Sequence, residues 1–191
     1  MAGGLGARVH VLGPHCLCHL SCSSVGPQPN KNMNNTKLES MISKAAEGAI
    51  LKEMMTLEVA VKLIEAVENK ATEMGLAVVV AVSNAAGRPI AVHCMDGAYH
   101  GSFDVAINKT FTSTAFQMST KKLADLCRPG ESLYGLQFSN DGKVMILGGG
   151  EPLMIGSTMI GALGVSGASA EDDSYLAAFG AAALKEVITC L

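Results

Sequence analysis

The stretch GGGEPLMIGSTMIGALGVSGASAEDD, residues 148–173, decides the fold of this chain. Glycine fills 7 of its 26 positions, and short apolar runs of small residues separate the glycines. Because glycine adopts positive φ freely and lets two backbones approach closely, this pattern predicts tight turns around two short strands. Ser169 and the three acids at 171–173 then predict the start of a helix, since the helix dipole favours negative charge in its first turn.

Composition indicates one globular domain without a nucleic-acid surface or a membrane span. Of the 191 residues, 49% are hydrophobic and 16% are charged, a balance typical of a protein with a sizeable packed core. The formal net charge is −3 and no block of basic residues is present, so we expect no nucleic-acid partner. No apolar run reaches the roughly 18 residues of a transmembrane helix, so no membrane partner is expected.

The cysteines and the first residues of the chain bear on its location and its domain boundary. The six cysteines are scattered and do not form a disulfide framework, which favours a reducing, cytoplasmic location. Residues 1–33 are broken by Gly and Pro and hold several Cys and His, but without the C-x-x-C-H spacing of covalent haem attachment. We expect a disordered leader or linker at 1–33 and the folded domain at 34–191.

Apolar periodicity and turn residues predict the order of helices and strands. Helices are expected at 36–50, 57–74, 102–116, 119–126 and 169–191, with Thr36, Thr56, Ser102, Ser119 and Ser169 as their N-terminal caps. Strands are expected at 76–83, 90–95, 143–147 and 158–165, and residues 133–138 are expected to form a loop or a weak strand. This order predicts an α+β sandwich, in which helices cover the faces of one central antiparallel sheet.

Several sequence motifs in fixed order carry a resemblance to a known family. They are LEVAVKLIEAV (57–67), HCMDGA (93–98), SFDVAINKTFTSTAF (102–116), RPGESLYGLQ (128–137), GGGEPL (148–153), IGALGVSGASAEDD (160–173) and AAFGAAAL (177–184). In these motifs the chain resembles the GlcG/HbpS-like haem-binding, or haem-degrading, family, which includes the C-terminal domain of PduO-type proteins. The resemblance implies about five antiparallel strands flanked by helices on both faces, as in profilin-like and PAS-like sandwiches.

The same resemblance implies haem as a candidate cofactor and homo-oligomers from dimers to octamers. It also implies a place beside diol, glycerol or glycolate utilisation. Two departures limit what is carried over. Residues 83–87 read S-N-A-A-G where the family has V-D-x-G-G, so Asn84 replaces a carboxylate, and Cys94 replaces an arginine. The adenosyltransferase activity of some relatives is not carried over.

Candidate ligand-binding residues fall in four places along the chain. They are the loop of Met95, Asp96 and Gly97, the helix residue Lys109, the run of Gly148, Gly149 and Gly150, and the acids Glu171 and Asp172. Each also has a structural explanation, because an Asp caps loops, a lysine stem can be buried below an exposed ammonium, and glycines form turns. We expect a ligand pocket formed by the Met95–Gly97 loop, Lys109 and the glycine run, with the ammonium anchoring a carboxylate such as a haem propionate.

Two histidines are candidate ligands for a haem iron. His93 and His100 flank the loop at 95–97, and a neutral imidazole is a competent iron ligand. A structural or surface histidine is the alternative for each. The acids Glu171 and Asp172 could instead bind a cation together, or act only as helix-capping residues.

Three classes of function remain open from the sequence. The first, which we favour, is a small-molecule binding protein whose ligand is a haem or a corrinoid. The second is an enzyme, such as one of haem degradation, although no pairing of a nucleophile with a base is evident in the sequence. The third is a non-catalytic oligomeric accessory protein of a metabolic enzyme complex, because its many Ala and Gly residues permit close subunit packing.

Overall fold

The structure is a computed structural model that describes residues 36–43 and 54–190. Residues 36–43 are helical with exposed side chains, in agreement with the start of the helix expected at 36–50. The rest of that helix, and the leader expected at 1–33, lie outside the described residues. Within the described part of the chain, no helix is both long enough and apolar enough to cross a membrane.

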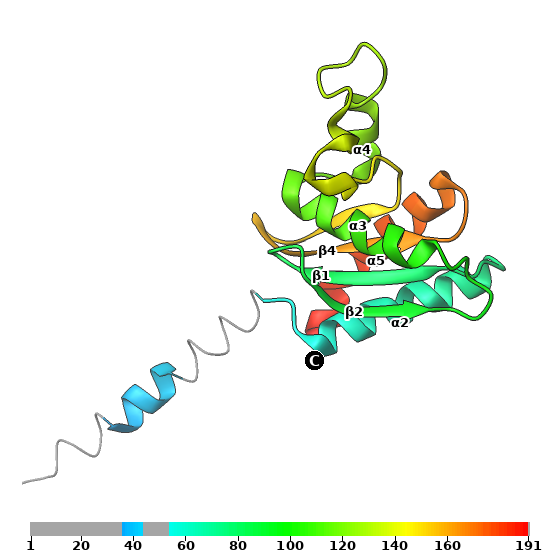
Figure 1. Ribbon diagram of the computed structural model, residues 1–191. Helices are drawn as coiled ribbons and strands as arrows, with labels where there is room; N and C mark the ends of the chain where they lie inside the picture. Colours follow the sequence, from blue (N-terminus) through cyan, green and yellow to red (C-terminus); the bar gives the residue numbers. More distant parts are fainter. Residues whose placement is uncertain (1–35, 44–53, 191) are drawn as a thin grey trace, which may run out of the picture. The chain divides into compact units, whose positions relative to one another are not determined.

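Four antiparallel strands form the central sheet in the order β2-β1-β4-β3 (Figure 1). The strands are β1 (Val79–Asn84), β2 (Pro89–Cys94), β3 (Gly150–Ile155) and β4 (Thr158–Ser166). β1 lies in the middle, where Val80 pairs with His93 of β2 on one side and with Val165 of β4 on the other. Hairpins join β1 to β2 and β3 to β4, so the long-range pairing of β1 with β4 unites the two halves of the sheet.

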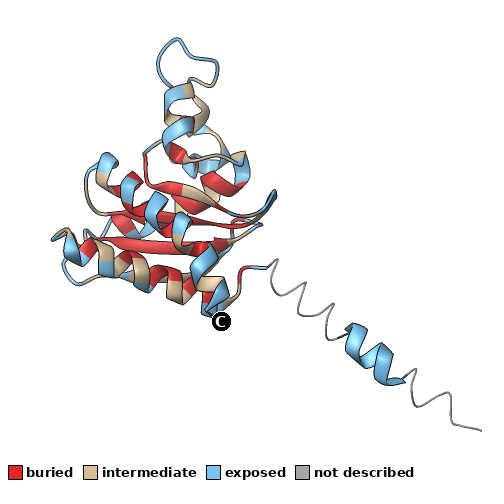
Figure 2. Cartoon of the chain, turned by 180° about the vertical axis from the view of Figure 1, so that it is seen from behind, coloured by how far each residue is buried: buried red, intermediate tan, exposed pale blue. Residues whose placement is uncertain are grey.

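Helices cover both faces of the sheet, as the sequence predicts. α2 (Leu57–Glu73) and α5 (Ala170–Thr189) pack together on one face, and α3 (Ser102–Phe116) lies on the other (Figure 1). The first five residues of β1 are buried because both faces of this strand are covered, and Figure 2 shows the buried layer between the helices. The main apolar cluster joins α2, α5 and the strands, and a smaller one joins Val79 and Ala81 to Ala106 of α3.

Side-chain caps at three helix starts agree with the sequence prediction. The hydroxyls of Thr56, Ser119 and Ser169 accept backbone N–H bonds from Val59, Lys122 and Asp172, at 3.2, 3.3 and 3.1 Å. Such caps satisfy backbone donors that have no partner inside the helix. The predicted cap at Ser102 is wrong: the residue that precedes α3 is Gly101, and Ser102 is the first, buried residue of the helix.

The strand predicted at 143–147 is also wrong. Within residues 54–190 the sheet has four strands, close to the expected number of about five. The backbone of this segment bonds to a helix side chain: the N–H of Met145 donates to the hydroxyl of Thr112 in α3, at 2.8 Å. The segment therefore lies along α3, and its Val144 packs with Leu123 of α4 (Thr120–Leu126). Residues 133–138 form turns that end in a 3-10 helix, Leu136–Phe138.

Candidate functional site

A buried ion pair joins α3 to the start of α5 behind the glycine run. Lys109 is only 1% exposed, and its Nζ donates to Oδ2 of Asp173 at 2.8 Å and to the carbonyl oxygen of Val165 at 2.6 Å. The other carboxylate oxygen of Asp173 accepts the N–H of Ala168 at 3.1 Å. These bonds fix α3, β4 and α5 against one another, so the pair holds the centre of the fold together.

Burial opposes the charge on both members of this pair. It lowers the pKa of the Lys109 ammonium below its ordinary value, and it raises the pKa of the Asp173 carboxyl above its ordinary value. In each case the direct contact between the two groups acts in the opposite direction. Each charge therefore depends on the other, and the Lys109 ammonium is already engaged inside the protein. Its predicted role as an anchor for a ligand carboxylate stays a prediction.

The glycine run passes directly over this pair. Gly149 has φ +113°, and a Cβ there would lie 2.6 Å from the Val165 oxygen and 2.8 Å from the Lys109 Nζ. Only glycine fits this position without displacing the ion pair. The next residue, Gly150, donates its N–H to the Thr120 hydroxyl at 2.8 Å. All three glycines are buried, so the run is a packed turn leading into β3.

Asp173 was not predicted as a site residue, although its spacing in the sequence indicates that it is buried. Asp173, Leu176, Ala177 and Gly180 follow the i, i+3, i+4, i+7 spacing of the buried face of α5. A carboxylate in such a stripe needs a partner, because an unpaired buried charge is costly. The partner lies 64 residues away in sequence, and the packing of α3 against β4, which leads into α5, brings the two side chains together.

The other predicted ligand-binding residues lie in separate places. Gly148 and Glu171 line a pocket of about 210 Å³ between α4 and the start of α5. Asp172 accepts a bond from the Ser169 hydroxyl at 2.8 Å, as part of the helix cap. Met95 packs against the apolar cluster of α2 and α5, on the face opposite to Lys109, while Asp96 and Gly97 are exposed. The structure thus brings Lys109 together with the glycine run but not with the 95–97 loop.

The two candidate histidines also lie apart. Nδ1 of His93 is 3.2 Å from a carboxylate oxygen of Glu68, which places the imidazole on the α2 side of the sheet. His100 is exposed in the turn before α3. In the part of the chain that the structure describes, no three His, Cys, Asp or Glu side chains are grouped so that they could hold a metal ion. The roles of His93 and His100 as iron ligands stay predictions.

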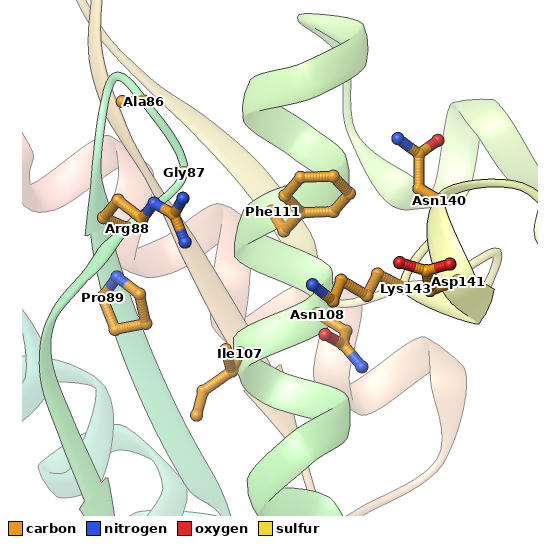
Figure 3. Close-up of a pocket in the computed structure, with 10 residues that line it drawn as sticks. All are labelled: Ala86, Gly87, Arg88, Pro89, Ile107, Asn108, Phe111, Asn140, Asp141 and Lys143. Atoms are coloured by element: carbon orange, nitrogen blue, oxygen red, sulfur yellow. The ribbon is translucent and has the colours of Figure 1, made fainter.

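A polar pocket of about 350 Å³ lies between the β1–β2 turn, α3 and the segment before Val144 (Figure 3). Arg88 and Lys143 extend toward each other from opposite walls, and α3 lies between them (Figure 3). The lining residues are Ala86, Gly87, Arg88, Pro89, Ile107, Asn108, Phe111, Asn140, Asp141 and Lys143. This "polar pocket" combines two cations and two amides with an aromatic ring, groups that can bind an anionic ligand with a flat apolar part.

Local geometry positions both cationic walls. On one side, Oδ1 of Asn84 accepts the N–H groups of Ala86 and Arg88, each at 3.0 Å, and holds the turn that presents Arg88. Asn84 thus provides an oxygen acceptor where the family pattern has a carboxylate. On the other side, Asn140 and Asp141 have φ of +52° and +57°, a left-handed conformation that Asn and Asp adopt more readily than other non-glycine residues. The carbonyl oxygen of Asn140 accepts the N–H of Lys143 at 3.1 Å, which fixes the turn that presents Lys143.

The predicted site residues did not include Arg88, Lys143 or Phe111. They come from segments up to 55 residues apart, and the contact between α3 and the 143–145 backbone brings the second wall into place. One signal was available, because the S-N-A-A-G departure from the family pattern falls in the turn that presents Arg88.

A second pocket of similar size is less suited to orienting a polar ligand. It measures about 360 Å³ and lies between the β3–β4 hairpin and the end of α5. Its lining includes Met154, Ile155, Leu184 and Ile188, with Lys185 as its only charged residue among those described. Ligand sites rely on a few convergent polar groups for orientation and specificity, so the polar pocket is the stronger candidate.

Comparisons with known proteins agree with this fold. The family model described as "Haem degrading protein HbpS-like" matches residues 55–182. An uncharacterised 15.0 kDa protein of the dhaT-dhaS intergenic region of Citrobacter freundii is 40% identical over 123 residues, which cover 64% of this chain and 87% of that protein. The corrinoid adenosyltransferase PduO of Salmonella typhimurium is 35% identical over 123 residues, which are 64% of this chain but only 37% of PduO.

A solved structure described as a PduOC:heme complex has the same fold. It superposes with a TM-score of 0.66 and 33% sequence identity, covering 68% of this chain and 94% of the solved chain.

Proposed function

This chain belongs to the HbpS-like family, and on that premise we propose that it binds a haem-type tetrapyrrole by the carboxylates of the ring, in the polar pocket. The observation that carries the proposal is the pair of cations, Arg88 and Lys143, extended toward each other across α3 (Figure 3). A relative with 33% identity has been solved as a complex with haem, which supports this ligand class.

The lining residues have the chemistry that one edge of such a ring requires. Haem carries two propionates on one edge of a flat apolar ring. The Arg88 guanidinium can bind a carboxylate with two parallel bonds, and the Lys143 ammonium can bind the second as a compact charge. The Phe111 ring and the Ile107 side chain offer apolar contact, and Asn108 and Asn140 offer amide donors.

The pocket does not fit the iron. Haem iron is held by His, Cys, Met or Tyr, and none of the ten lining residues, all within the described ranges, is of these types. The volume of about 350 Å³ is at the lower end of the roughly 300–1,000 Å³ of ligand pockets, so it suits the carboxylate edge and not the whole ring. The proposed binding therefore relies on the protein's own cations.

The same chemistry favours haem over a corrinoid. The peripheral side chains of cobalamin are mostly amides, which are neutral, whereas those of haem include two carboxylates. Charge-assisted hydrogen bonds are about twice as strong as neutral ones, so the two cations discriminate in favour of haem.

Titration with haemin, followed at its Soret band, tests the proposal. A hydrogen bond to a charged group is worth roughly 1.5–3 kcal/mol, so Arg88→Ala and Lys143→Ala should each weaken binding by roughly 10- to 150-fold. Lys122→Ala is the matched control, because Lys122 is an exposed lysine of α4 outside the polar pocket, and it should leave affinity unchanged. Wild-type protein without saturable binding would refute the proposal, and so would equal losses in all three variants.

We also propose that the chain works as a homo-oligomer beside an enzyme of diol, glycerol or glycolate utilisation. The chain belongs to the HbpS-like family, and the resemblance to that family implies homo-oligomers and a place beside such enzymes. Light scattering at several protein concentrations tests the oligomer, and a monomer at all concentrations would refute it.

A further inference from the structure

We infer that the polar pocket recognises the carboxylate edge of the ring independently of the metal, so that its ligand class includes metal-free dicarboxylate porphyrins. This inference rests on the proposed function and deepens it, because it separates two sources of affinity that haem combines. One source is the pairing of the propionates with protein cations. The other is coordination of the iron by a protein side chain.

The lining residues provide the groups for the first source of affinity, which is the pairing of the propionates with protein cations. Arg88 and Lys143 are cations and Asn108 and Asn140 offer N–H donors, and all four suit the oxygens of a carboxylate. Iron in haem instead takes imidazole, thiolate, thioether or phenolate groups. The pocket therefore matches the periphery of the ring and gives the metal no partner among its lining residues.

The positions of the two candidate histidines agree with this separation. His93 contacts Glu68 of α2, whereas the polar pocket lies on the α3 side of the sheet. His100 precedes α3, while the pocket residues of that helix begin at Ile107.

Pocket size gives the same result. A pocket of about 350 Å³ lies at the lower end of the roughly 300–1,000 Å³ of ligand sites, so we expect it to enclose the carboxylate edge of the ring and not its centre. Removal of the metal would then leave the contacts with Arg88, Lys143 and Phe111 unchanged.

The charged side chains that line the pocket act directly on the carboxylates of the ring. Arg88 and Lys143 attract them, and Asp141, also in the lining, repels them. Methyl esters of the propionates remove both effects while keeping the ring and its flat apolar face. Esterification therefore distinguishes recognition of the carboxylates from nonspecific adhesion of a flat ring.

Three probes test the inference on the full chain: haemin, metal-free protoporphyrin IX and its dimethyl ester. Binding is measured by calorimetry for all three and by porphyrin fluorescence for the two metal-free rings. Haemin and protoporphyrin IX should bind with affinities within about threefold of each other, and the diester should bind at least roughly 100-fold more weakly, since it loses two charge-assisted contacts. Arg88→Ala should weaken both acids by the same factor and leave the diester unchanged.

The outcomes separate the inference from the proposed function. If haemin binds and Arg88→Ala weakens it, but protoporphyrin IX does not bind, the metal is required as well as the carboxylates, and the inference fails while the proposed function stands. A diester that binds as tightly as the acid overturns carboxylate recognition. If neither haemin nor protoporphyrin IX binds, the proposed function itself fails.

Discussion

Replacement of Lys109 by methionine should destabilise the fold more than any change on its surface. Methionine has nearly the length of lysine but no charge and no donor. The variant leaves the Asp173 carboxylate and the Val165 carbonyl without their bonds from Nζ, at a site where Lys109 is 1% exposed. Because water does not reach these oxygens, their lost partners are not replaced.

The expected loss in the free energy of unfolding is about 3–5 kcal/mol. Removal of one partner from a buried ion pair typically costs about this much, and an unsatisfied buried carbonyl alone costs roughly 1–3 kcal/mol. Since domains are stable by only about 5–15 kcal/mol, the variant should fold but unfold at a much lower urea concentration.

Urea unfolding followed by circular dichroism measures this loss, and a second variant provides the control. Asp173→Asn combined with Lys109→Met removes the uncompensated charge but keeps an oxygen that can accept the Ala168 N–H. The double variant should recover at least about 2 kcal/mol relative to Lys109→Met. A cost below about 1 kcal/mol for the single variant, or a double variant less stable than it, would refute the internal ion pair.

Three further predictions concern the glycine run, the polar pocket and β3. Gly149→Ala should lower stability by at least about 2 kcal/mol, because φ is +113° and the new Cβ meets the Val165 oxygen at 2.6 Å; an unchanged melting temperature would contradict this. Asp141→Asn should tighten haemin binding by roughly three- to tenfold, because it removes a repelling charge and asparagine tolerates the left-handed backbone; weaker binding would contradict the pocket assignment. Burial raises the pKa of the Glu151 carboxyl above its ordinary value of 4.5, so the native state holds the proton more tightly than the unfolded state does. Loss of this proton therefore lowers the free energy of unfolding as the pH rises from the ordinary pKa to the higher pKa of the native state. Glu151→Gln should therefore melt at a higher temperature than wild type at pH 7, with the difference closing below pH 4.5, and equal melting at both pH values would contradict this.

Local signals were enough to predict most of the helices. Each of the three caps joins a side-chain hydroxyl to the backbone N–H three residues later, so a short stretch of sequence is enough to identify it. The capping residues are Thr56, Ser119 and Ser169. The buried strand β1 was equally clear from its continuous apolar run. The α+β arrangement followed from the order of these elements.

Long-range contacts explain what the sequence did not predict. Residues 143–147 have the apolar pattern of a strand, but the Thr112 hydroxyl, 33 residues earlier, takes the Met145 N–H. Likewise, Lys109 was a predicted site candidate, while its partner Asp173, 64 residues later, is brought to it by the packing of α3 against β4. Such contacts between distant segments are set by tertiary packing, which local propensity does not encode.

The polar pocket could not be predicted from the sequence for the same reason. Arg88 follows a turn and Lys143 follows a glycine, which are ordinary positions for exposed cations. Their convergence beside Phe111 appears only when α3 lies between the two segments (Figure 3).

Calorimetric titration of haemin into the wild-type chain and into the double variant Arg88→Ala/Lys143→Ala tests the central claim most directly. The account predicts saturable binding by the wild type and affinity lower by roughly 100-fold or more in the double variant, since the two losses add for separate contacts. Circular dichroism of both proteins verifies that the fold is retained. A folded double variant that binds haemin as tightly as the wild type would contradict the assignment of the ligand to this pocket.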